Sequence, residues 1–90
     1  MDKKNYSAPA LDKGLDILEL LAVSSTGLTQ AEIAEHLNKS VNEIYRMLNT
    51  LKVRNYLEFD SPTDSYKLSY KLLNLSASFN PTKTLLQKAN

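Results

Sequence analysis

The side chains with the clearest chemical potential lie in one stretch, LNKSVNEIYRMLNTL, residues 37–51. Apolar residues recur there every three or four positions, which predicts a helix with one buried face. The residues expected on that face are Val41, Ile44, Leu48 and Leu51. The opposite face carries hydrogen-bonding groups and one ring, from Asn42, Glu43, Tyr45, Arg46 and Asn49. At DNA base edges arginine pairs with guanine, asparagine pairs with adenine, and glutamate accepts from cytosine. Side chains of these kinds could contact bases, but on an exposed helix face they are more often simply solvated or paired locally.

A local alternative exists for the arginine of this helix. Glu43 precedes Arg46 by three residues and Asn42 precedes it by four, so an intrahelical pair would occupy the guanidinium. Glu43 also completes a capping box with Ser40, and we expect capping to be its main role. The helix start that Ser40 caps would in addition offer backbone amides and a positive dipole end to a phosphate.

The elements that position this stretch follow from the spacing of apolar and turn residues. The expected helices span residues 10–24, 30–37, 41–54 and 70–79, and the expected strands span residues 56–60 and 66–69. Thr29 and Glu32 form a capping box at the start of the second helix. Only residues 38–40 separate that helix from the third, and turn residues 61–65 join the strands into a hairpin. We therefore predict a mainly α fold with a small β-hairpin, a winged helix-turn-helix.

Composition and charge narrow the classes of function. The 90 residues carry a net charge of only +1. Three Lys oppose six Asp/Glu in residues 1–35, whereas eight Lys/Arg oppose four Asp/Glu in residues 36–90. Such unevenness would give a polyanion a basic face, although chance produces the same pattern. The longest apolar run, residues 17–23, is interrupted by Glu19 and is too short to cross a bilayer. The N-terminus lacks the apolar segment of a signal peptide, so we expect a cytoplasmic protein without a membrane partner.

Catalytic and cofactor chemistry lack the residues that they need. The sequence has no cysteine, which excludes disulfides and cysteine-bearing zinc sites. His36 is the only histidine, and no Ser or Asp partner can be assigned to it. The two glycines, Gly14 and Gly27, form no phosphate-binding loop. We expect no enzymatic activity, no cofactor and no metal.

Five segments together resemble the DNA-binding domain of IclR-type bacterial transcriptional regulators. They are ALDKGLDILELL, GLTQAEIAEHL, KSVNEIYRMLNTL, RNYLEFD and SYKLSYKLLNL, and the match runs from about residue 8 to residue 86. The most specific part is IYRML at residues 44–48, where the family commonly has His or Tyr followed by Arg. The sequence departs from the family at Asn55 and Asn38, where Gly is usual or frequent, but Asn also tolerates left-handed geometry.

The resemblance implies an architecture and partners. Residues 1–79 would be the winged helix-turn-helix domain, and residues 80–90 the start of a linker helix to an absent effector domain. Double-stranded DNA would be the partner, read by a homodimer with the helix at residues 41–54 in the major groove. A small-molecule effector would act only through the missing C-terminal domain. Leu11 and Leu20 are candidates for a dimer face, unless they complete the core.

The expected contact residues fall on three elements. Thr29 and Gln30 open the second helix, where Thr29 caps the helix in either case. Lys67 lies in the hairpin, or wing, whose Asp60 and Asp64 make it a weak electrostatic arm. The full DNA-binding set is Thr29, Gln30, Lys39, Ser40, Asn42, Tyr45, Arg46, Asn49 and Lys67. The competing hypothesis is a winged-helix protein-interaction module that does not bind DNA, which the weak net charge favours.

Overall fold

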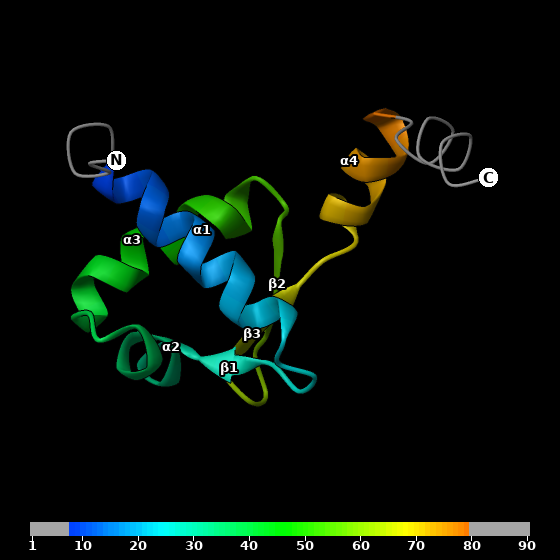
Figure 1. Cartoon of the computed structure of the whole chain (residues 1–90). Helices are drawn as coiled ribbons and strands as arrows, with labels where there is room; N and C mark the ends of the chain where they lie inside the picture. The colour runs from blue at the N-terminus through cyan, green and yellow to red at the C-terminus, as the bar shows by residue number, and fades with distance from the viewer. Residues whose placement is uncertain (1–7, 80–90) are drawn as a thin grey trace.

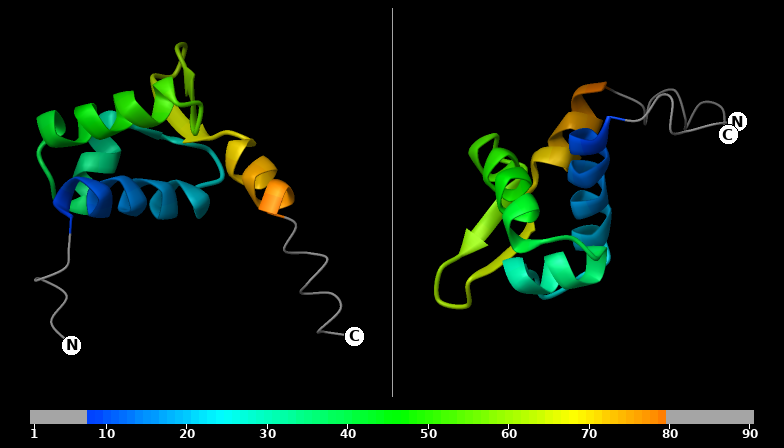
Figure 2. Two further views of the ribbon diagram at one scale, coloured as in Figure 1. Left: turned by 90° about the horizontal axis from the view of Figure 1, so that it is seen from above. Right: turned by 90° about the vertical axis from the view of Figure 1, so that its left-hand side faces the viewer.

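The computed structural model describes residues 8–79. The order of elements is α1 (Pro9–Ala22), β1 (Leu28–Thr29), α2 (Gln30–Leu37), α3 (Val41–Val53), β2 (Leu57–Asp60), β3 (Ser65–Leu68) and α4 (Lys71–Phe79) (Figure 1). Helices α1 and α3 lie side by side, and the turn between β2 and β3 extends past the helices as a wing (Figure 2). The predicted winged helix-turn-helix is confirmed. The expected linker start at residues 80–90 lies outside the described residues.

Two capping boxes set the helix-turn-helix, as the sequence predicts. At the start of α2, Thr29 Oγ1 accepts from the Glu32 amide at 3.2 Å and Glu32 Oε1 accepts from the Thr29 amide at 2.8 Å. Ser40 and Glu43 form the same box at the start of α3. Between the two helices Asn38 adopts φ 56°, and this left-handed residue ends α2. The three-residue turn is therefore fixed locally at both ends.

The core lies where the three helices meet the sheet. Its buried residues are Ile17, Leu21, Ile33, Ala34, Ile44, Leu48, Leu57 and Tyr66. The predicted buried face of α3 is wrong at Val41, which is 47% exposed, because this first helical residue stands at the edge of the packed face. Met47 instead packs partly against the core.

The buried face of α1 includes only some of its regularly spaced leucines. Leu21 is buried and Leu18 packs against the core, whereas Leu11 and Leu15 are 61% and 45% exposed. Ile17 is fully buried and Leu21 nearly so. Leu20 packs against the core, so of the two leucines considered for a dimer face only Leu11 is free.

The sheet has three strands in the order β1–β3–β2, one more than the predicted hairpin. Leu28 pairs with Tyr66 and Thr29 with Ser65, both antiparallel. A strand of two residues is too short to show alternation, so no periodic pattern predicts it. Gly27 precedes it with φ 83°, and a Cβ there would lie 2.9 Å from the Tyr66 carbonyl oxygen. Glycine is therefore required for this chain to approach β3.

Helix α4 contributes nothing to the core. None of its residues is buried, and Leu73 and Phe79 are 65% and 80% exposed. Figure 1 shows it standing away from the helical body, joined by the segment after β3. No helix among residues 8–79 has the length and apolar character needed to span a membrane.

Candidate DNA-binding surface

The outward face of α3 carries three of the predicted contact residues in one row. Asn42, Arg46 and Asn49 are spaced four and three residues apart, which places them on one side of the helix, and all are exposed. Ile44 and Leu48 on the opposite side are fully buried and hold that row outward. The packing of α3 therefore presents two amides and a guanidinium together.

One flank of α3 turns toward the sheet. Tyr45 is 53% exposed. The pKa of the Tyr66 phenol on β3 is raised, chiefly by burial and further by Tyr45 and Asp64. Lys52 lies with its Nζ 5.0 Å from the Phe59 ring centre, a cation–π contact that directs this lysine to the wing.

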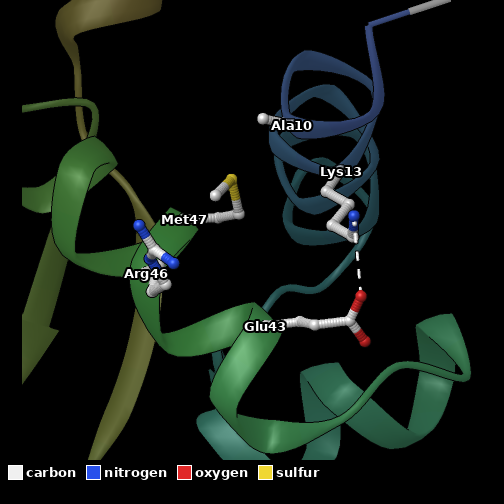
Figure 3. Close-up of a pocket in the computed structure, with 5 residues that line it drawn as sticks. All are labelled: Ala10, Lys13, Glu43, Arg46 and Met47. Atoms are coloured by element: carbon white, nitrogen blue, oxygen red, sulfur yellow. Dashed lines mark ion pairs between the residues drawn. The ribbon is translucent and has the colours of Figure 1, made fainter.

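The other flank of α3 faces α1 across a shallow crevice of about 260 Å³. Its lining residues are Ala10, Lys13, Glu43, Arg46 and Met47 (Figure 3). Lys13 and Glu43 point toward one another from the two helices, and the Arg46 guanidinium extends away from the Glu43 carboxylate. The crevice thus brings a residue of α1 to the edge of the row of contact residues.

Both carboxylate oxygens of Glu43 are engaged. Oε1 accepts from the Ser40 amide at 3.1 Å and from the Ser40 hydroxyl at 3.3 Å, and Oε2 lies 3.5 Å from Lys13 Nζ. The Ser40 amide, with the Ser40 hydroxyl and Lys13 adding to it, lowers the pKa of the Glu43 carboxyl below its ordinary value. Glu43 is therefore a capping residue in this structure, as expected, and not a partner of Arg46.

Arg46 is left without an acidic partner within the described residues. The ion pair between Lys13 and Glu43 is the one salt bridge found among residues 8–79. The intrahelical pair that the sequence allowed is not formed. Lys13 was missed by sequence reasoning, because it precedes Glu43 by thirty positions and only the packing of α1 on α3 brings them together.

The predicted residues of α2 have structural partners. Thr29 caps α2, and the Gln30 Nε2 donates to the Val41 carbonyl at 3.1 Å, which ties the first turn of α3 to α2. Lys39 and Ser40 are exposed in the turn directly before α3. The turn therefore places Lys39 beside the start of α3, while Gln30 holds the first turn of α3 against α2.

The wing holds the last predicted contact. Lys67 is exposed on β3, opposite Glu58 in the register, on the face of the hairpin away from the buried Leu57 and Tyr66. In the turn, the Thr63 hydroxyl donates to the Asp60 carboxylate. Lys67 is thus separate from the row on α3. Among residues 8–79, His, Asp and Glu side chains form no group of three that could hold a metal ion.

Comparison with known proteins gives these residues a context. The sequence model of the IclR helix-turn-helix domain matches residues 10–61. The chain is 39% identical over 80 residues to the HTH-type transcriptional regulator BhcR of Paracoccus denitrificans, a match that covers 89% of this chain and 28% of BhcR.

Solved structures agree with the sequence match. An IclR transcriptional regulator from Alicyclobacillus acidocaldarius superposes with a TM-score of 0.76 at 29% identity, over 80% of this chain and 29% of that one. An IclR family regulator from Brucella abortus gives a TM-score of 0.74 at 25% identity, over 84% and 29% of the two chains. The chain spans less than a third of the length of these relatives. It belongs to the IclR helix-turn-helix domain family.

Proposed function

We propose that this domain binds double-stranded DNA in a sequence-specific way, with α3 lying in the major groove. Membership of a family of DNA-binding regulatory domains favours this function over the protein-interaction module. The observation that carries the assignment to α3 is the exposed row of Asn42, Arg46 and Asn49, with Arg46 unpaired by any acid of the described residues. A protein-binding groove would instead favour several exposed aromatic or aliphatic anchors, whereas this row is polar except for Val53 at its C-terminal end.

The roles within the site follow from side-chain chemistry. Arg46 is suited to the O6 and N7 acceptors of guanine, and Asn42 and Asn49 to adenine. Lys39 and the start of α3 at Ser40 suit a phosphate, since cations and helix N-termini bind the backbone and set the register. Tyr45 adds a ring and hydroxyl at the edge of the groove.

The remaining predicted residues fit supporting roles. Lys67 would reach flanking backbone from the wing, weakened by the acids beside it. Thr29 caps α2, and Gln30 holds the first turn of α3 through its bond to the Val41 carbonyl. Any contact of these two residues with a phosphate would be additional to these structural roles.

The domain is proposed to act as part of a longer transcriptional regulator, as the name of BhcR describes that relative. A single module with so few cations binds weakly, so a homodimer reading two half-sites about one helical turn apart is the expected form. A small-molecule effector would act through a further domain outside this sequence. Enzymatic activity is not part of the proposal.

The test begins with selection of a preferred duplex from a random pool, followed by fluorescence-anisotropy titration at several salt concentrations. We expect the affinity to fall with salt along a log–log slope of several units, because phosphate neutralisation releases counterions. Arg46→Ala should reduce affinity for the selected duplex by about ten-fold or more, the value of one bidentate base contact.

The matched control is Arg54→Ala. It removes the same charge from the other arginine of the sequence, at the C-terminal cap of α3. A smaller loss is expected there, without a change in the preferred sequence. Equal losses for the two variants would assign Arg46 to general charge only. No binding by the folded chain, nor by a tethered dimer, would refute the function.

A further inference from the structure

Lys13 is placed unusually for a surface lysine. Its side chain is only 19% exposed, on the face of α1 that packs against α3, and its ammonium meets Glu43 at 3.5 Å (Figure 3). Because its partner Glu43 is 45% exposed, the ion pair is screened by solvent and contributes little to stability, which gives weak reason for the arrangement. The position of its partner suggests a different effect.

Glu43 carries a negative charge in the first turn of α3, at the N-terminal end that would face the DNA backbone. The charge favours the positive end of the helix dipole, but it also opposes the approach of a phosphate. Lys13 offsets that charge from the side of α1. The box with Ser40 is kept, because it uses the other carboxylate oxygen.

Glu43 is also a competitor for Arg46. Residues three apart on a helix are within reach of each other, and both side chains line the same crevice. With Oε2 directed to Lys13, the carboxylate points away from the guanidinium. The two effects both favour DNA binding: the first lowers the repulsion of a phosphate at the start of α3, and the second leaves Arg46 free for a base.

We infer that Lys13 is a positioning residue for DNA recognition, which holds the Glu43 carboxylate and keeps Arg46 available to a base without itself contacting the phosphate backbone. The inference rests on the proposed DNA binding by α3. It assigns to α1 a part in recognition that does not depend on reaching the groove.

The experiment is a double-mutant cycle on the 90-residue chain, with Lys13→Gln, Glu43→Gln and the double variant, titrated against the selected duplex. Glutamine at position 43 retains a capping box, so this variant removes the charge while keeping the helix start. We expect Lys13→Gln to weaken binding by about two-fold, since the freed carboxylate then competes for Arg46. The same change in the Glu43→Gln background should have almost no effect, and Lys13→Arg should bind like the original chain.

The salt dependence separates positioning from direct contact. A lysine that touches a phosphate contributes about one unit to the log–log slope, so Lys13→Gln should leave the slope unchanged. A second readout is the preference for guanine over other bases at the position read by Arg46, which should fall in Lys13→Gln and return in the double variant. Circular dichroism confirms that each variant is folded.

Two results would overturn the inference while leaving DNA binding intact. One is a slope reduced by about one unit with equal losses in both backgrounds, which would make Lys13 a phosphate contact. The other is unchanged affinity and base preference in Lys13→Gln. If neither the original chain nor a tethered dimer binds DNA at low salt, the proposed function itself is refuted.

Discussion

At the scale of single residues, the helix-turn-helix depends on a backbone conformation that few side chains adopt. Asn38 in the turn before α3 has φ 56°, and Asn55 after α3 has φ 72°. Both positions were expected to be left-handed because the family has Gly where these asparagines stand. Asn adopts this conformation at lower cost than other non-glycine residues.

Asn38→Ala should therefore destabilise the domain by about 1 kcal/mol, while Asn38→Gly should be near neutral. The side chain is exposed, so packing is unchanged in either variant. Urea denaturation measures both. Equal stability of the two variants would show that the turn does not depend on the left-handed residue.

Glu43 gives the domain a pH dependence with a definite sign. Its folded pKa lies below the ordinary 4.5, chiefly because of the Ser40 amide. A depressed carboxyl pKa stabilises the fold at pH above the unfolded value, and the contribution is lost as the pH falls through the folded value. Glu43→Gln should reduce the loss of stability between neutral pH and about pH 3.5. Thermal unfolding at both pH values measures this, and Glu58→Gln on β2 is the control. An unchanged pH dependence would contradict the assigned role.

At the scale of elements, the sequence predicted most of what had a local signal. Capping boxes placed the starts of α2 and α3 where they occur, and alternation located β2 and β3 within about one residue. On α1 the sequence left Leu11 and Leu20 open between core and surface, because its many leucines satisfy more than one helical face and only packing selects Ile17 as a fully buried residue. Strand β1 was missed because its two residues are too few to alternate and because its partner β3 lies far along the sequence.

In the candidate site, too, features with a local sequence signal were predictable and contacts between helices were not. The outward row of α3 follows from the burial of Ile44 and Leu48, so it was predictable. The bond from Gln30 to Val41 and the ion pair from Lys13 to Glu43 join different helices, and no spacing rule encodes them. The predicted DNA contacts themselves stay predictions.

The approach of β1 to β3 provides a test at this scale. Gly27→Ala would place a methyl group 2.9 Å from the Tyr66 carbonyl oxygen at a φ of 83°, so we expect a loss of about 1 kcal/mol or more. The matched control is Gly14→Ala in the middle of α1, where no atom lies within 4 Å of the added carbon. That change should stabilise the domain by about 0.5–1 kcal/mol through helix propensity. Denaturant unfolding of both variants gives the comparison, and a loss in Gly14→Ala matching that in Gly27→Ala would refute it.

At the scale of the whole molecule, the apolar surface that remains outside the core bears on assembly. Leu11 is exposed on α1 and lines an apolar crevice of about 310 Å³ together with Gly14 and Met47. Scattered leucines on a surface are ordinary, but an exposed leucine at an apolar crevice is a candidate for an interface. We expect the homodimer to use this side of α1.

Leu11→Asp should shift the chain toward monomer in sedimentation velocity and lower its affinity for a two-half-site duplex, because a charge would be buried in the interface. The fold should be retained, as Leu11 lies outside the core. Leu73→Asp on α4 places the same charge on another exposed leucine and serves as the control. A dimer that survives Leu11→Asp but not Leu73→Asp would move the interface to α4.

The separation of α4 from the core divides the described chain into two tiers of local stability. None of its residues from Lys71 to Phe79 is buried, so this segment gains little tertiary packing, the main source of helix stability in proteins. Its start is fastened through Ser69, whose hydroxyl accepts from the Lys71 amide at 3.0 Å and whose own amide donates to the Tyr56 carbonyl at 3.0 Å. Beyond that point its fraying is uncoupled from global unfolding, so the amides of α4 exchange with solvent through local openings long before those of α3.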